Sequence, residues 1–352
     1  MSDLQLRYYN FRGKNKKMFD AFLQKYADYT QYDYYAPAAT ELRALRALTL
    51  SQQKKADSEN DSLAQSPAKN STGKDFQLGT WIVNQETKML FHLLDQAEYL
   101  ELRTNRNRGL ITIAEQHKLY DVKVGVIGLS VGSQLALNAA RMGIGKSFIL
   151  ADFDTVEITN LNRTPYFLSD IGKPKVSVIA QQMLQVDPYL KIDCIQKQMS
   201  TTELEKVVES VDIIVDAFDD FEKKVFLRKV ARSRKIPVVS GYDVDRGALL
   251  IVERYDTENV SEKIFLHAAS NESLLKKSGS PEDKIKKFMD LIGIENHSQR
   301  MLDVVNKLGI EYAGIPQLLP TGQLLCSLWT LSIIDIILGT TKKSLRSFVV
   351  NE

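Results

Sequence analysis

Residues 122–240 alternate between two hydrophobic patterns, one typical of buried strands and the other of amphipathic helices. Apolar runs at 122–127 and 148–151 predict two strands, and apolar positions at helical spacing predict a helix over 131–142 between them. The pattern continues with strands expected at 190–195, 211–216 and 236–240, and helices at 173–186, 201–209 and 221–235. We therefore expect an α/β fold, with a Rossmann-like, doubly wound and mainly parallel sheet, an N-terminal extension and C-terminal helices.

The N-terminal extension is rich in aromatic residues. Seven of the 14 tyrosines lie between Tyr8 and Tyr35, among the basic residues Arg7, Arg12, Lys14, Lys16 and Lys17. Two interpretations fit residues 1–50: a surface on which RNA bases stack, or a small helical unit that packs its aromatic side chains on the main domain. Residues 51–75 are polar and predict a disordered linker, so we expect the main domain to span 76–352.

The C-terminal part of the chain is expected to be helical. Residues 262–310 are charged and have a helical pattern without a recognisable motif. The most apolar segment, 324–339, carries Asp335 and is too short to span a bilayer, so it predicts a buried core helix.

Composition adds three expectations about location and partners. The 352 residues are 44% hydrophobic and 26% charged, which is typical of globular proteins. The net charge is +2, from 46 basic and 44 acidic residues, so no overall field favours nucleic acid or a membrane. The N-terminus lacks the apolar stretch of a signal peptide. We expect a cytoplasmic protein with no membrane partner.

A glycine-containing loop, "GLSVGS", follows the first strand of the βαβ unit. Gly128 predicts a tight turn, and the small residues Ser130 and Gly132 allow backbone N–H groups at the helix N-terminus to approach a phosphate. Asp152 ends the second strand, where an acid accepts ribose hydroxyls. The loop is irregular, because Ser130 and Ser133 stand where a dinucleotide-binding loop would have glycines.

Polar residues continue beyond Asp152. A dehydrogenase would need little beyond that acid, because the nicotinamide itself carries out the hydride chemistry. The segment "ADFDTVEITNLNR" supplies Asp154, Asn160, Asn162 and Arg163, and "GKPK" supplies Gly172 and Lys175. Two fixed cations beyond a phosphate-binding helix suit a triphosphate, whose oxygen charges must be neutralised during reaction. The alternative is that Arg163 and Lys175 are solvated loop charges. The surrounding polar motifs argue against this alternative.

These motifs resemble the ThiF/MoeB/ubiquitin-activating-enzyme superfamily of ATP-dependent adenylyltransferases, from about residue 103 to 252. The resemblance implies that Asp152 binds the ribose, and that Asn160, Arg163 and Lys175 act on the phosphate side.

Two further motifs carry the same resemblance. In "VDIIVDAFDD", Asp219 stands where the family binds magnesium, and Asp220 where it usually has asparagine. In "LRTNRNRGLIT", Arg106 matches an arginine that reaches the ATP of a partner subunit, which implies a homodimer.

A closer resemblance is to bacterial ThiF-like domains found upstream of nitroreductase-like domains. It rests on "LGTW", "GLSVGS" and "DRGALLIVERYD". About 100 residues follow the last of these motifs, which are too few for a nitroreductase-like domain.

The two cysteines do not form a metal motif. Neither Cys194 nor Cys326 belongs to a CxxC pair, and the four histidines are scattered, so no zinc site is expected. Cys194 lies in an alternating strand pattern and Cys326 in the apolar helix, so both are expected to be buried rather than to accept an acyl group.

The resemblance implies an enzyme that uses ATP and Mg²⁺ to activate a carboxylate as an acyl adenylate, releasing pyrophosphate. The carboxylate would be the C-terminus of a ubiquitin-like or sulfur-carrier protein, or a peptide. With a pKa of about 4 it is already ionised at neutral pH and needs no general base. Two alternatives remain: an enzyme like tRNA threonylcarbamoyladenosine dehydratase, supported by the aromatic and basic N-terminal segment, and a non-catalytic nucleotide-binding module, suggested by the atypical glycine loop and Asp220.

Overall fold

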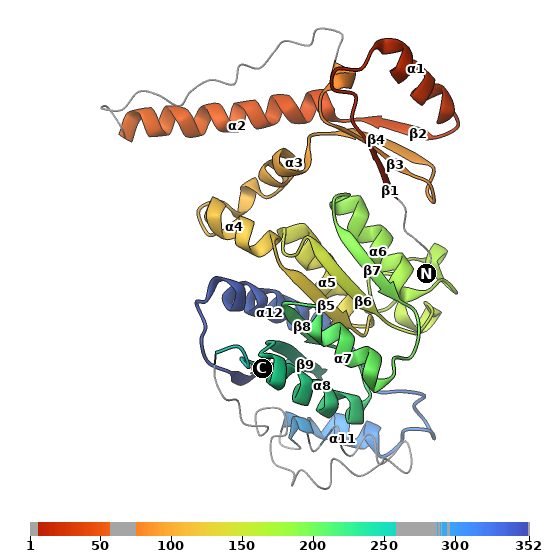
Figure 1. Ribbon diagram of the computed structural model, residues 1–352. Coiled ribbons are helices and arrows are strands. Elements are labelled where there is room, and N and C mark those ends of the chain that lie inside the picture. Colours follow the sequence, from red (N-terminus) through yellow and green to blue (C-terminus); the bar gives the residue numbers. More distant parts are fainter. Residues whose placement is uncertain are drawn as a thin grey trace. The chain divides into compact units, whose positions relative to one another are not determined.

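The computed structural model describes residues 6–56, 75–257, 287, 289, 291–293 and 296–350. The chain divides into two compact units, residues 2–110 and 111–352 (Figure 1).

The N-terminal unit contains a four-stranded sheet with strand order β1-β3-β4-β2. The strands are β1 (Leu6–Tyr9), β2 (Thr30–Asp33), β3 (Thr80–Asn84) and β4 (Met89–Leu93). The helices are α1 (Lys16–Lys25), α2 (Tyr35–Ala56) and α3 (Gln96–Arg103), with short 3₁₀ turns η1 (Asp75–Gln77) and η2 (Asn105–Asn107). β2 runs parallel to β4, and the other two pairs are antiparallel.

Aromatic side chains form the core of this unit. Phe19 and Phe22 on α1 are buried against Trp81 on β3, with ring centroids 5.0 and 6.0 Å apart. The hydroxyl groups of Tyr9 and Tyr26 hydrogen-bond at 2.9 Å. The N-terminal segment therefore contributes strands as well as helices to an α/β unit that β3 and β4 complete, rather than a unit of helices alone. The pairing of residues 6–9 with 80–84 could not be read from local periodicity.

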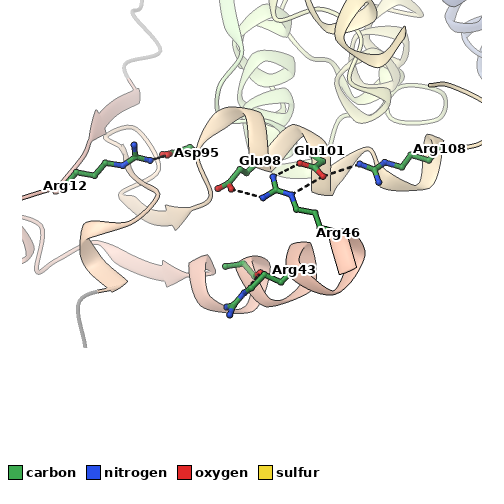
Figure 2. Close-up of polar contacts among 8 residues, drawn as sticks. Arg12, Arg43, Arg46, Asp95, Glu98, Glu101 and Arg108 are labelled. Carbon is green, nitrogen blue, oxygen red and sulfur yellow. Dashed lines mark hydrogen bonds and ion pairs between the residues drawn. The ribbon is translucent and has the colours of Figure 1, made fainter. Parts of the chain in front are cut away.

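Ion pairs join α2 to α3, as Figure 2 shows. Arg46 on α2 contacts Glu98 at 3.3 Å and Glu101 at 2.7 Å, and Arg108 contacts Glu101 at 3.2 Å. Arg12 pairs with Asp95 at the start of α3. The hydrogen bond from Arg46 lowers the pKa of Glu101. These ion pairs link α2, whose own sequence has little amphipathic character, to α3.

The division between the units differs from the predicted boundary at residue 76. β3 and β4 complete the sheet of the N-terminal unit, so residues 76–110 belong with it. Of the predicted linker, residues 51–56 are part of α2 and 57–74 lie outside the described residues.

The second unit contains a seven-stranded sheet in its described part, with order β11-β10-β9-β8-β5-β6-β7. The strands are β5 (Lys123–Ile127), β6 (Ser147–Ala151), β7 (Lys191–Ile195), β8 (Ile213–Asp216), β9 (Val238–Val244), β10 (Gly247–Glu253) and β11 (Leu345–Val350). The helices are α4 (Ile113–Tyr120), α5 (Gly132–Met142), α6 (Lys175–Val186), α7 (Thr201–Glu209), α8 (Phe221–Arg234), α11 (Gln299–Val305) and α12 (Leu319–Leu338), with 3₁₀ turns η3 (Ile158–Asn160) and η4 (Leu168–Asp170).

This architecture confirms the predicted α/β, mainly parallel Rossmann-like sheet. β5 to β9 pair in parallel, whereas β10 and β11 add an antiparallel edge that the sequence did not predict. α5 packs with α6 and α12, and α7 packs with α8 against the other face (Figure 1). α6 begins at Lys175, so Pro174 is its N-cap and not a residue of its first turn.

The apolar C-terminal helix α12 is longer than predicted. It begins at Leu319, and its 20 residues are long and apolar enough to cross a membrane, so the expectation that it was too short was wrong. Length and composition alone are weak support for a membrane span, because core helices have the same properties. Trp329 is buried and donates a hydrogen bond from Nε1 to Ser240 O at 2.9 Å, so α12 packs against the sheet as predicted.

Candidate functional site

A cavity of about 510 Å³ lies at the carboxyl ends of β5, β6 and β8 in the described part of the second unit. This is the edge where open parallel sheets bind ligands. Six residues predicted from the sequence line it: Gly128, Ser130, Asp152, Lys175, Asp219 and Asp220. The fold thus brings these predicted residues together at one edge of the sheet.

The glycine loop packs against the loop after β8. Gly128 has a φ of +91°, and a Cβ there would lie 2.3 Å from Ala217 O, so only glycine fits. Gly132 opens α5, where a Cβ would lie 3.1 Å from Val126. Ser133 is buried and donates from Oγ to Ser130 O at 2.5 Å, which closes the turn. Ser133 thus has a structural role in this loop, and Gly128 and Ser130 line the cavity.

Asp152 is held by backbone N–H groups at the end of β6. Its two carboxylate oxygens accept hydrogen bonds from Leu129 N at 2.6 Å and Asp154 N at 2.8 Å. Burial raises the pKa of Asp152, whereas these two hydrogen bonds favour its ionised form. Neither bond involves a side-chain donor, so the carboxylate can still accept hydroxyl groups from a ligand.

Lys175 places a buried cation at the first residue of α6. Its Nζ donates to Asp154 Oδ2 at 2.9 Å, and its backbone N–H donates to Asp154 O at 3.1 Å. A lysine is unfavourable at the positive end of a helix unless an anion lies beside it. Because both the ammonium and the helix end are positive, this side of the cavity suits an anionic ligand.

Asp219 and Asp220 follow β8 and have different surroundings. Asp219 is exposed and makes no hydrogen bond or ion pair with the described residues. Asp220 is the N-cap of α8, accepting a hydrogen bond from Lys223 N at 3.0 Å and contacting Lys223 Nζ at 2.9 Å. Aspartate caps a helix as well as asparagine does, so Asp220 has a structural role at this position.

Asn160 and Arg163 do not line the cavity. Asn160 is buried and accepts from Glu157 N at 3.0 Å, closing η3. Arg163 donates from Nη1 to Thr159 O at 2.6 Å and to Asn162 Oδ1 at 2.8 Å. Their contacts with a nucleotide remain predictions.

The segment with Arg106 lies in the N-terminal unit. Arg108 pairs with Glu101, and Arg103 lies over the Tyr99 ring, 5.9 Å from its centroid. Arg106 is exposed on η2 and makes no hydrogen bond or ion pair with described residues. Its guanidinium is thus not committed to a described contact within its own chain.

Sequence reasoning missed several cavity residues, including Lys197, Lys223 and Lys287. Lys197 pairs with Glu203, and this pair together with the cap at Ser200 lowers the pKa of Glu203 to about 2. Lysines in loops and first turns look like solvated charges in a sequence, and only the fold shows that they face one cavity.

Asp219 is the candidate magnesium ligand of this cavity. No group of three or more His, Cys, Asp or Glu side chains is arranged for a metal ion among the described residues. Mg²⁺ is commonly held by one or two carboxylates together with substrate phosphates, which suits Asp219 at the cavity rim.

Cys326 is buried with Sγ 3.2 Å from Val131 O, whereas Cys194 is only half-buried, so the prediction that both are buried was wrong for Cys194.

Comparison with known proteins identifies similar chains. The model of the ThiF family matches residues 104–350. The uncharacterized protein MT1398 of Mycobacterium tuberculosis is 32% identical over 239 residues, covering 68% of this chain and 33% of that protein. The sulfur carrier protein ThiS adenylyltransferase of Escherichia coli is 30% identical over 144 residues, covering 40% and 57%. The chain thus spans between a third and three-fifths of the length of these relatives.

A solved structure of Escherichia coli MccB with MccA has a TM-score of 0.50 and 21% identity, covering 68% of this chain and 63% of that one. This likeness supports the fold.

Proposed function

Because the chain belongs to the ThiF family, we propose that it is an ATP-dependent adenylyltransferase that activates a carboxylate as an acyl adenylate. One observation carries the proposal: Asp152, Lys175 and Asp219 come from three separate segments and line one cavity beside the N-terminus of α5. The proposed carboxylates are the C-terminus of a ubiquitin-like or sulfur-carrier protein and the carboxylate of a peptide.

The cavity offers a distinct environment to each part of ATP. Asp152 would accept the ribose hydroxyls, because its carboxylate is held by backbone N–H groups alone. The N–H groups of residues 128–132 and the ammonium of Lys175 would face the phosphates. Lys175 would then exchange its contact with Asp154, which is half-exposed and can be rehydrated, for a phosphate oxygen.

The reaction requires charge neutralisation rather than proton transfer. A carboxylate oxygen of the substrate attacks the α-phosphorus, a new P–O bond forms, and the bond to pyrophosphate breaks. The nucleophile is already an anion at neutral pH, so no base takes part. Lys175 lowers the repulsion between the two anions. Mg²⁺, when bound by Asp219, would supply further neutralisation of the phosphate charge.

Two arginines complete the proposed site. Arg163 is proposed to approach the phosphates from the loop after β6. Arg106 is proposed to enter the site of a second subunit in a two-fold homodimer, because its side chain is exposed and has no described contact that it would have to break. We further propose a cytoplasmic location.

ATP–pyrophosphate exchange with a panel of carrier proteins and peptides tests the proposal. We expect exchange that depends on one class of carboxylate and that is lost in Asp219→Ala. ATP turnover that depends on tRNA would instead indicate the dehydratase-like alternative. Calorimetric titration in which NAD binds more tightly than Mg·ATP would refute the assignment.

A further inference from the structure

A network of four charged side chains lies beside the cavity and is closed to solvent. Asp216 accepts from Lys224 Nζ at 2.7 Å through one carboxylate oxygen and from Arg228 Nη1 at 2.7 Å through the other. Arg228 Nε lies 2.9 Å from Glu253 Oε2. The four residues are between 0 and 5% exposed. Alone, burial would raise the pKa of Asp216, but the two cations hold it below its ordinary value.

Stability is a poor explanation for such a network. Removing charges from water is costly, and well-packed apolar residues often serve a protein core equally well or better. What the network adds is fixed geometry between elements. It joins the end of β8 to α8 and β10, and Arg228 Nη2 donates to Ser240 Oγ on β9 at 3.0 Å. Tyr255 closes the far end by donating to Glu253 at 2.9 Å.

The network also contacts the loop that carries Asp219. Asp216 is the last residue of β8, three positions before Asp219. The Lys224 ammonium lies 5.0 Å from the centroid of the Phe218 ring. Lys224 therefore contacts the side chains of both neighbours of Ala217, which are Asp216 and Phe218. Ala217 N in turn donates to Ile127 O at 2.9 Å, beside the glycine loop. The loop between β8 and α8 is thus held by Lys224 and by a backbone hydrogen bond to β5.

We propose that Lys224 and Asp216 are positioning residues that hold the 217–220 loop so that Asp219 can bind the metal ion of a bound nucleotide. This inference rests on the proposed function. Groups that orient a metal ligand typically contribute 10–100-fold to metal affinity without touching the metal, and the same scale is expected here.

The test measures metal binding separately from nucleotide binding. The main variant is the double substitution Asp216→Asn with Lys224→Met, which removes one charge of each sign and leaves Arg228 paired with Glu253. Lys224→Arg is the conservative variant. Arg234→Met is the matched control, because Arg234 lies on the same helix and forms an ion pair with Glu209 at the surface.

Three measurements are made on the full chain: thermal unfolding, ATP affinity in EDTA by calorimetry, and the dissociation constant of Mn²⁺ from the ATP complex by electron paramagnetic resonance. We expect the double variant to lose about 10–100-fold in Mn²⁺ affinity while its ATP affinity in EDTA changes by less than about twofold. Lys224→Arg should retain most of the Mn²⁺ affinity, and Arg234→Met should match the wild type.

Two results would overturn the inference while leaving the proposed function in place. One is unchanged Mn²⁺ affinity in a folded double variant, when Asp219→Ala does lose it. The other is a parallel loss of Mn²⁺ and metal-free ATP binding, which would indicate general damage to the cavity. A wild-type protein that binds no ATP, or an Asp219→Ala variant with full Mn²⁺ affinity, would refute the proposed nucleotide or metal site, and the inference with it.

Discussion

Replacing Lys175 with methionine should separate phosphate binding from the rest of nucleotide recognition. Lys175 is 5% exposed, and its Nζ contacts Asp154 at 2.9 Å. Methionine has a similar length and keeps the apolar contacts of the side chain, but it cannot neutralise a phosphate oxygen.

The expected cost to binding is large and the expected cost to stability small. A hydrogen bond to a charged group contributes about 1.5–3 kcal/mol, so Lys175→Met should weaken ATP binding by about 10–100-fold. Exchange should fall by about 10²–10³, the scale of losing one charge-stabilising donor. Asp154 is half-exposed and can be rehydrated, so the ion pair itself should contribute no more than about 1 kcal/mol and the melting temperature should fall by at most about 4 °C.

Calorimetry with two ligands checks this reasoning. Affinity for ATP should fall in Lys175→Met, whereas affinity for adenosine, which has no phosphate, should not change. Lys173→Met is the control, because Lys173 lies two residues earlier and contacts Asp170 at 3.4 Å from an exposed position. Equal losses for ATP and adenosine, or no loss for either, would show that Lys175 does not face the phosphates.

Three further predictions concern the dimer, the glycine loop and pH. Inactive Arg106→Ala and Asp219→Ala subunits, mixed and allowed to exchange, should recover about a quarter of wild-type activity, because half the dimers would be mixed and each would have one intact site; a monomeric mass in solution would contradict this. Gly128→Ala should lower the free energy of unfolding by about 3 kcal/mol or more, since a Cβ would lie 2.3 Å from a carbonyl oxygen at a positive φ; an unchanged urea midpoint would refute it. The hydrogen bond with His92 lowers the pKa of Asp33. The stabilising effect of this bond is therefore complete above about pH 4 and is lost as the pH falls through the lower pKa of the folded state. Asp33→Asn should flatten the acid side of the plot of unfolding free energy against pH, and an unchanged slope there would count against the prediction.

The sequence alone determined the parallel part of the sheet and the position of the cavity. Helix α7 spans Thr201–Glu209 as predicted, because the capping box of Ser200 and Glu203 and the apolar spacing are local signals. Asp152 and Asp219 lie at one edge because the carboxyl ends of parallel strands all meet there. Their meeting follows from strand order and the handedness of the crossovers, so it needs no knowledge of side-chain packing.

Tertiary structure decided the features that depend on contacts between distant residues. In the sequence, Lys224 and Arg228 belong to a charged stretch that looks like a solvated helix face, but they are buried because Asp216 and Glu253 pair with them. Asn160 and Arg163 have the residue types of a phosphate site, yet their described hydrogen bonds are made within their own loop. Local periodicity reports which face of an element is apolar. It does not report which charged group will find a partner, since that depends on elements brought together only when the chain folds.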